Sequence, residues 1–217
     1  MSKRTIAIGD IHGCAQALSR LIEAIEPTED DTLVPLGDFV DRGPDSRGVL
    51  TMLIELVDRC QLVPLLGNHE VMMLNAFESP ESMEFWLDVG GQETLDSYGG
   101  SLAEVPPEHW VFLRGLRRYY ETESHLFVHA NFDPELTLEQ QPDRLLLWEH
   151  IVHTLPSRHA SGKTAIVGHT PQGTGEALDL GHLICIDTYC VGGGWLTALD
   201  VASGRIWQAN RSGQLRQ

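Results

Sequence analysis

Apolar residues in the first third of the chain follow two spacings, one typical of buried strands and one typical of helices. Short β-rich runs at residues 5–8, 32–36 and 61–66 predict three strands. Between them, apolar side chains recur at helical spacing over residues 15–25 and 46–58, which predicts two helices. Because strands and helices alternate, we expect right-handed crossovers and a largely parallel sheet.

The pattern changes over the middle of the chain. Apolar residues recur there at helical spacing, two Gly-Gly pairs interrupt them, and a Pro-Pro pair at residues 106–107 begins a further helix. We interpret residues 71–116 as a helical cap or insertion. The methionine and aromatic side chains of this segment are expected to form core rather than a cofactor site.

The last part of the chain is rich in predicted strands. We expect them at residues 117–121, 125–129, 164–167, 183–187, 195–200 and 205–208, with helical turns around residues 142–152. The last two of these strands are close enough in sequence to form a hairpin. Because no crossovers separate the late strands, we expect them to build a second sheet, mixed or antiparallel. The tail from Arg211 is expected to be loose.

Composition limits the classes of protein that the chain can represent. Its 217 residues, 42% of them hydrophobic, fit one domain with a sizeable core. The formal charge of −16 argues against a nucleic-acid-binding surface, which would be basic. No apolar run approaches the roughly 18 residues of a membrane span, and no secretory signal precedes the first strand, so we expect a cytoplasmic protein. The four cysteines form no CxxC pair, which favours free thiols over a structural zinc site.

Polar strings follow each of the three predicted N-terminal strands. They read Gly-Asp-Ile-His-Gly at residues 9–13, Gly-Asp-Phe-Val-Asp-Arg-Gly at 37–43 and Gly-Asn-His-Glu at 67–70. The side chains that they supply are Asp10, His12, Asp38, Asp41, Arg42, Asn68 and His69. In an open α/β sheet, ligands bind at the carboxyl ends of the strands, where these residues lie. Oxygen and imidazole ligands that converge there suit a site for two transition-metal ions.

Two more histidines occupy the same position at the ends of later predicted strands. His129 follows residues 125–128 in a Phe-Val-His-Ala-Asn string, and His169 follows residues 164–168 in a Val-Gly-His-Thr-Pro string. Neutral imidazole is a good ligand for manganese, iron or zinc. The histidines that lack this context are expected to lie on the surface or in the packing; they are His109, His125, His153, His159 and His182.

This ordered set of motifs resembles the phosphoprotein phosphatase branch of the metallophosphoesterases, in particular the compact bacterial and phage serine/threonine phosphatases. The resemblance runs from Ile6 to about Leu199. It implies an α/β fold in which two mixed sheets form a β-sandwich flanked by helices. The whole chain, residues 1–217, would then be one calcineurin-like metallophosphoesterase domain, with the helical cap at about 71–116.

The resemblance also implies a role for each strand-end residue. Asp10 and His12 would bind the first metal ion and Asp38 would bridge both ions. Asn68, His129 and His169 would complete the second. The expected cofactors are two divalent transition-metal ions. Mn²⁺ is the first choice, and Fe, Zn, Ni or Co are alternatives. A hydroxide that bridges the ions would attack phosphorus directly, without a phosphoenzyme.

Three residues would act on the substrate side of such a site. Asp41 would pair with His69, which suits general-acid catalysis because the departing alkoxide needs a proton and a neighbouring carboxylate keeps the imidazole protonated. Arg42 would bind the substrate phosphate, since a guanidinium stays charged and captures oxygens in a bidentate manner. Asn68 and His150 are further candidates for phosphate contacts.

His150 marks a departure from the family pattern. The small bacterial members commonly carry a Leu-Leu-Trp-x-Arg string whose arginine is a second phosphate clamp, whereas this chain has His150 at that position. Arg144, Arg158 or a cap residue could replace the clamp instead, or the clamp could be weaker. Tyr189 and Trp195 also differ from the pattern, and could line the substrate cleft or serve packing.

The first functional hypothesis is a metal-dependent phosphomonoesterase that acts on phosphoserine and phosphothreonine in proteins. Its partner would be a phosphoprotein or phosphopeptide, with no nucleic acid and no membrane; the oligomeric state stays open. Symmetrical diadenosine tetraphosphate hydrolases, or a broad-specificity phosphoesterase, are the alternative. The tetraphosphate hydrolases share the first motif but tend to carry Gly-Asn-His-Asp and to lack Val-Asp-Arg-Gly. This chain has Glu70 in place of that last Asp and contains Asp-Arg-Gly at residues 41–43, which favours the phosphatase. A catalytically silent metal-binding module is the remote third possibility.

Overall fold

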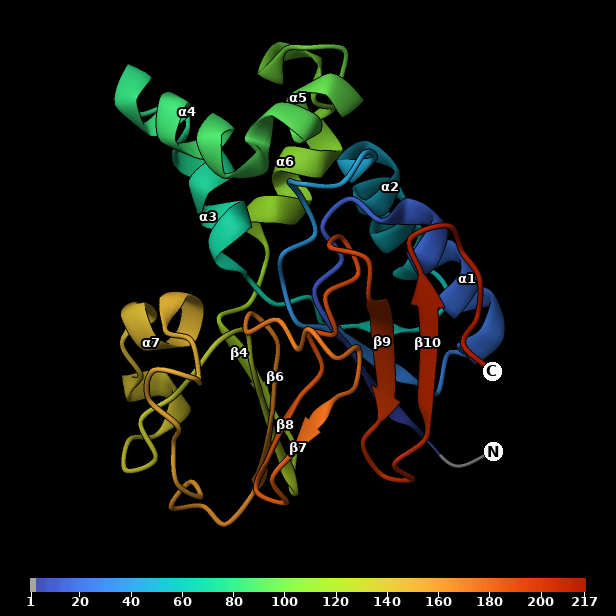
Figure 1. Cartoon of the computed structure of the whole chain (residues 1–217), viewed down its shortest axis with the longest axis vertical. Helices are drawn as coiled ribbons and strands as arrows, with labels where there is room; N and C mark the ends of the chain where they lie inside the picture. Colours follow the sequence, from blue (N-terminus) through green and yellow to red (C-terminus); the bar gives the residue numbers. More distant parts are fainter. Residues whose placement is uncertain (1–2) are drawn as a thin grey trace.

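Two five-stranded sheets pack face to face in the computed structural model, which describes residues 3–217 (Figure 1). Alternate residues of the first strand show how the layers form. Ala7 points into a buried cluster that also contains Phe127 and Ile166 of the other sheet. Ile6 and Ile8 point the other way, into the core shared with the flanking helices. The predicted two-sheet α/β sandwich is therefore confirmed.

The first sheet has the strand order β10-β9-β1-β2-β3. Its parallel strands are β1 (Thr5–Ile8), β2 (Thr32–Pro35) and β3 (Gln61–Leu62), and the helices α1 (Ala15–Ile25) and α2 (Ser46–Leu56) connect them. Strand β3 is shorter than predicted because Pro35 of β2 lacks the N–H that would continue the ladder between the two strands. The chain still follows β2, since the N–H groups of Val63 and Leu65 donate to carbonyls of that strand.

The last two strands, β9 (Trp195–Asp200) and β10 (Ile206–Asn210), form the predicted hairpin. They belong to the first sheet, because β9 pairs antiparallel with β1. The prediction that they lie in the second sheet was wrong, since local sequence does not record which open edge a strand joins. The tail is also more ordered than predicted: the Arg216 guanidinium donates to the Gln208 side chain at 2.8 Å.

The second sheet is mixed, as predicted, with the order β4-β5-β6-β8-β7. Its central strands β5 (His125–Val128), β6 (Thr164–Val167) and β8 (Leu183–Cys185) are parallel, and the edge strands β4 (Tyr119–Glu121) and β7 (Leu178–Asp179) are antiparallel. The short β7 was not predicted. Helix α7 (Asp143–Trp148) packs on the outer face of this sheet through Leu146 and Leu147.

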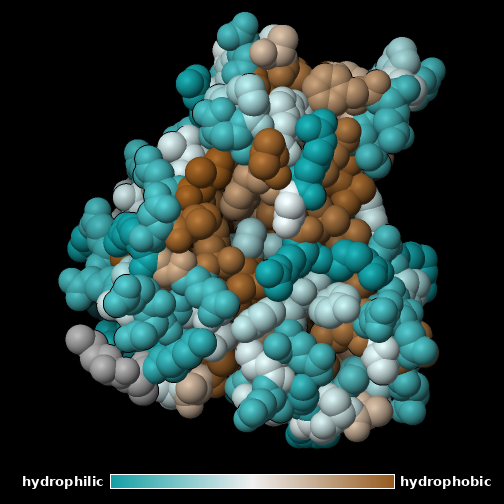
Figure 2. All heavy atoms as spheres, turned by 180° about the vertical axis from the view of Figure 1, so that it is seen from behind, coloured by the Kyte–Doolittle hydropathy of each residue, from teal (hydrophilic) through white to brown (hydrophobic). Residues whose placement is uncertain are grey.

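Helices fill the segment between β3 and β4, where the cap was expected. They are α3 (Asn68–Asn75), α4 (Pro80–Trp86), α5 (Gln92–Ser97) and α6 (Pro107–Arg114), with a kink at Gly90 between α4 and α5 and a 3₁₀ turn at Leu102–Glu104. Figure 1 shows them gathered at one end of the sheets. From behind, apolar side chains gather in the upper middle of the molecule (Figure 2). That the chain forms a single domain remains a prediction.

Within the described residues, no helix is both long and apolar enough to cross a membrane. The four cysteines are buried free thiols, as predicted.

Candidate active site

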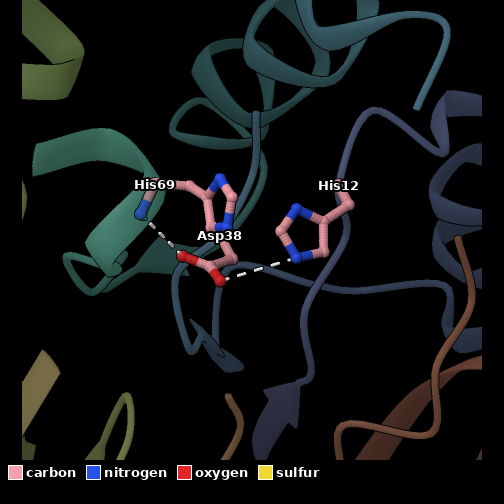
Figure 3. A group of neighbouring side chains, drawn as sticks. All are labelled: His12, Asp38 and His69. Atoms are coloured by element: carbon pink, nitrogen blue, oxygen red, sulfur yellow. Dashed lines mark hydrogen bonds and ion pairs between the residues drawn. The ribbon is translucent and has the colours of Figure 1, made fainter. Parts of the chain in front are cut away.

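Asp38 lies at the centre of the residues that the strand ends deliver. His12 approaches one of its oxygens, with Nε2 3.5 Å from Oδ2, and the backbone N–H of His69 donates to the other, Oδ1, at 3.1 Å (Figure 3). His129 comes from the second sheet and places Nε2 3.4 Å from Oδ1. Both sheets therefore contribute to one buried carboxylate.

Three of the histidines are held as neutral imidazoles by backbone carbonyls. His12 donates its Nδ1–H to Val40 at 2.9 Å, and His129 donates its Nδ1–H to Leu36 at 2.9 Å. His169 donates from Nε2 to Trp148 at 3.2 Å. Burial lowers the pKa of His12 and of His169 to about 3. The other ring nitrogen of each residue thus keeps a lone pair, the arrangement that metal-binding histidines use.

The lone pairs of His129 and His169 converge with oxygen acceptors on one side of Asp38. The Nε2 atom of His129 lies 3.2 Å from Nδ1 of His169 and 3.1 Å from Oδ1 of Asn68. Since the Nδ1–H of His129 is already donated, no donor sits among these atoms. Acceptors this close repel each other unless a cation lies between them. The imidazole, amide and carboxylate donor set fits a divalent transition metal.

The other side of Asp38 carries a second group, formed with His12 and His69. Asp10 lies outside both groups of close ligand atoms; its carboxylate oxygens accept the His169 backbone N–H at 3.1 and 3.0 Å. Burial and the nearby charges of Asp187 and Asp38 raise the pKa of Asp10 well above its usual range. A cation beside these carboxylates would relieve this repulsion.

Asp187 lies near these carboxylates and was not predicted from the sequence as a site residue. It follows strand β8 and is buried, and its Oδ1 atom accepts the Tyr189 backbone N–H at 3.1 Å. Burial, with the charge of Asp38, raises its pKa to about 7. Its position after a strand end, the same signal that singled out His129 and His169, could have identified it.

Left-handed backbone marks the same residues. Among the described residues, seven non-glycine positions have positive φ. Five of them are predicted site residues, namely His12 (44°), Asp38 (51°), Asp41 (71°), Arg42 (66°) and His169 (59°). Such conformations are costly for side chains with a Cβ and gather where function requires them. The loops after the strands are thus shaped to aim side chains into the site.

Glu70 holds the loop that carries Asp38. Its buried carboxylate accepts the backbone N–H groups of Asp38, Phe39 and Val40 at 2.9, 2.7 and 3.2 Å. Gly67 lets the next loop approach, because a Cβ there would lie 2.2 Å from Oδ1 of Asp38. This supporting role of Glu70 was not predicted from the sequence, where the residue only distinguishes the two candidate families.

His69 and Asp41 form the predicted pair. The Nδ1 atom of His69 donates to Oδ2 of Asp41 at 2.7 Å, and both side chains are buried. Burial alone would lower the pKa of His69, but the charges of Asp38 and Asp41 outweigh it and raise the pKa above its ordinary value. The ring is therefore suited to carry a proton that it can donate.

A depression of about 230 Å³ opens over these groups. Arg42 and His150 line it, and Arg42 donates from Nη1 to Nε2 of His12 at 3.1 Å. His150, which lines the depression, stacks on His169 with ring centroids 4.2 Å apart; its contact with a substrate phosphate stays a prediction. Burial and the neighbouring His153 lower the pKa of His150, which leaves its ring neutral near pH 7.

The alternative clamp residues lie elsewhere. Arg144 pairs with Glu149 at 2.5 Å, and Arg158 donates to the Gly162 carbonyl at 3.1 Å. Neither they nor Tyr189 and Trp195 line the depression.

Comparisons with known proteins point to one family. The model of the calcineurin-like phosphoesterases matches residues 3–194. The chain is 32% identical over 200 residues to serine/threonine-protein phosphatase 1 of Salmonella typhimurium (strain LT2). This match covers 88% of each chain. It is 33% identical over 138 residues to a symmetrical bis(5'-nucleosyl)-tetraphosphatase of Pseudomonas putida (strain GB-1), which covers 63% of this chain but 45% of that protein. The chain thus spans less than half the length of this second relative.

Solved structures share the fold. A protein provisionally described as a diadenosine tetraphosphatase superposes with a TM-score of 0.69 at 25% identity, covering 96% of this chain and 94% of that one. A cold-active protein-tyrosine phosphatase of a Shewanella species gives a TM-score of 0.72 at 18% identity, covering 100% of this chain and 80% of the other. This second likeness shows the fold alone.

Proposed function

Because the chain belongs to the calcineurin-like phosphoesterase family, and within it to the phosphoprotein phosphatase branch, we propose that it hydrolyses phosphoserine and phosphothreonine esters of proteins. The family match by itself indicates a hydrolase of the metallophosphoesterase family, without naming the substrate. The Asp41–His69 pair beside the depression that Arg42 lines, next to the acceptor groups around Asp38, supports proton donation to the leaving group of a phosphate substrate, and the phosphoprotein phosphatase branch favours a phosphoprotein as that substrate. The match to the Salmonella phosphatase over 88% of both chains agrees with it.

The residues around Asp38 fit two divalent cations, for which Mn²⁺ is our proposal. Asp10, His12 and Asp38 would hold one ion, and Asp38 would share the other with Asn68, His129 and His169. When bound, such ions supply a water of lowered pKa and neutralise the charge that develops on the phosphoryl group.

The remaining groups of the site would handle the substrate. His69 would give its proton to the leaving oxygen, since Asp41 orients its ring and the surrounding carboxylates raise its pKa. Arg42 would hold the phosphate oxygens, and Asn68 could add a contact. His150 would add at most a neutral hydrogen bond near pH 7, which makes the second phosphate contact weaker than an arginine would provide.

Hydrolysis of symmetrical dinucleoside tetraphosphates is the second candidate function. The relatives that carry this description share 32–33% identity with the matched part of the chain, and the match to a solved structure of similar description covers 94% of that structure's chain. The same cation and histidine chemistry would serve a phosphoanhydride. The substrate therefore has to be decided by assay.

A side-by-side assay tests the proposal. Wild-type protein would be given phosphoserine, phosphothreonine and phosphotyrosine peptides and diadenosine tetraphosphate, each with Mn²⁺, Mg²⁺, Ni²⁺ or Zn²⁺. We expect the highest kcat/KM on phosphoserine or phosphothreonine peptides with Mn²⁺, and loss of turnover in His69→Asn but not in the control His182→Asn. Faster cleavage of the tetraphosphate would replace the proposal with the second function. Bound metal without turnover of any phosphoester would contradict both.

A further inference from the structure

The buried carboxylate of Asp41 is held by side chains from the helical part of the molecule. The indole Nε1–H of Trp86 donates to both of its oxygens, at 3.0 and 3.0 Å. The Thr94 hydroxyl donates to Oδ1 at 2.8 Å, which leaves Oδ2 for Nδ1 of His69 at 2.7 Å. Trp86 and Thr94 follow Asp41 by 45 and 53 positions, so they reach it only through the tertiary fold.

The Thr94 hydroxyl uses its full hydrogen-bonding capacity around Asp41. Besides donating to the carboxylate, it accepts the Asp41 backbone N–H at 2.8 Å and lies 2.8 Å from the Ser46 hydroxyl. A hydroxyl has one donor and two acceptor positions, and all three are occupied here. Thr94 therefore fixes both the backbone and the side chain of Asp41.

The same segment also fixes Arg42. The Arg42 backbone N–H donates to the Gly90 carbonyl at 2.9 Å. Gly90 has φ of 117°, and a Cβ at this position would lie 2.6 Å from Cγ of Arg42 and 2.9 Å from its backbone nitrogen. Only glycine lets the chain come this close. One stretch, residues 86–94, thus contacts both Asp41 and Arg42.

Packing alone is the simpler explanation for Trp86, because a buried indole needs an acceptor for its N–H. It does not explain why Trp86 and Thr94 both converge on the one carboxylate that orients His69. Their donors also stabilise Asp41 as an anion at zero exposure, where an unpaired charge would be costly. The arrangement leaves the carboxylate one orientation, with Oδ2 toward His69.

We propose that residues 86–94 belong to the catalytic apparatus, with Trp86 and Thr94 as positioning residues that hold Asp41 so that His69 protonates the leaving group. The proposal rests on the proposed function, since it assumes that the chain cleaves phosphate esters. In that reaction the bond from phosphorus to the leaving oxygen breaks, and a bond from phosphorus to the oxygen of water forms. The proton of His69 goes to the leaving oxygen, and a proton from water restores His69.

Substrates with different leaving groups separate positioning from general stability. An alkoxide from a phosphoserine peptide needs the proton, whereas the p-nitrophenolate of an aryl phosphate departs without it. We expect Trp86→Phe and Thr94→Val to lower kcat on the phosphoserine peptide by about 10- to 100-fold. On p-nitrophenyl phosphate the loss should stay under about threefold. Thr94→Ser, which restores the hydroxyl, should recover most of the peptide activity.

Matched controls come from two other helices, α6 for Trp110 and α2 for Thr51. Trp110 packs on Phe77 at 5.3 Å between ring centroids, and the Thr51 hydroxyl donates to the Arg47 carbonyl, so neither bonds to Asp41. Trp110→Phe and Thr51→Val should leave the ratio of the two kcat values unchanged. Equal losses on both substrates, or no recovery in Thr94→Ser, would overturn the proposal.

Failure of the substrate proposal can be distinguished from failure of this inference. If the wild-type protein cleaves no phosphopeptide, the proposed substrate is wrong. Phenyl phosphate and p-nitrophenyl phosphate then provide the poor and the good leaving group. A selective loss on phenyl phosphate in Trp86→Phe would still support the positioning role, and a uniform loss would contradict it.

Discussion

His129 presents Nε2 to Oδ1 of Asp38 at 3.4 Å while the Leu36 carbonyl holds its Nδ1–H. The two residues come from different sheets, so neither sheet contains the site alone. The lone pair that faces Asp38 is a consequence of the hydrogen bond on the opposite side of the ring. The N-terminal strings therefore become a candidate dinuclear centre only after the second sheet has packed against the first.

Asp38→Asn is expected to reduce kcat by about 100-fold or more, since removing a ligand should cost at least as much as removing a residue that supports one. Asparagine keeps the shape of the side chain but removes the negative charge that both groups of histidines share. Turnover of p-nitrophenyl phosphate measures the loss, and thermal melting shows that the variant folds. Asp58→Asn, at an exposed position, is the control. A folded Asp38→Asn protein with kcat within about threefold of wild type would contradict the assignment.

The pH profile of kcat should move when Asp41 is replaced by Asn. The raised pKa of His69 keeps its ring protonated to higher pH, so activity is present below this pKa and is lost as the pH rises through it. Asp41→Asn removes one of the carboxylates that raise the pKa, and the alkaline limb should shift to lower pH by about one unit. The measurement is kcat on a phosphoserine peptide across the pH range. An alkaline limb that stays in place or moves upward would argue against His69 as the general acid.

His150→Arg should strengthen phosphate binding. The pKa of His150 is lowered, so it supplies no charge near pH 7, whereas a guanidinium is always charged. An added charge-assisted hydrogen bond should lower KM for a phosphopeptide by about tenfold, with kcat changed by less. KM and kcat of the two proteins provide the test. An unchanged KM would mean that residue 150 does not reach the phosphate.

A pH-dependent ion pair should stabilise the fold away from the site. The buried Asp31 carboxylate accepts Nε of Arg4 at 2.9 Å and Nη2 at 2.6 Å, and Arg4 holds the pKa of Asp31 well below its usual range. Its stabilisation is therefore present above the unfolded pKa of about 3.9 and is lost as the pH falls through the lower folded value.

Asp31→Asn should lower the free energy of unfolding at pH 7 by about 1–3 kcal/mol. Urea denaturation at pH 7 and at about pH 2.5 measures it, and the gap from wild type should shrink at the lower pH. Turnover should stay near that of wild type. A gap of equal size at both pH values would show that the ion pair contributes nothing.

Strand ends were the part of the site that the sequence could predict. β1 and α1 have the bounds that apolar periodicity predicts, so Asp10 and His12 could be placed between them. The same reasoning located His129 after β5 and His169 just beyond β6. In each case a short local pattern determines both the element and the position of the polar residue that follows it.

Contacts made through tertiary packing could not be predicted in this way. Trp86 and Thr94 lie in a segment whose apolar spacing indicates only a helix, yet their hydrogen bonds to Asp41 depend on how that segment packs. The pairing of β9 with β1 likewise depends on which sheet edge is open. Asp187 also follows a strand, but no histidine lies beside it in the sequence, so its place in the site was not predicted.

Metal stoichiometry tests the central claim, that residues of both sheets build two cation sites around Asp38. Equilibrium dialysis against Mn²⁺, with metal content measured per chain, would be run on wild type, His12→Ala and His169→Ala. We predict two ions per wild-type chain and one in each variant, because each histidine serves a different side of the shared carboxylate. A wild-type chain that binds fewer than two ions, or variants that both retain two, would contradict the account.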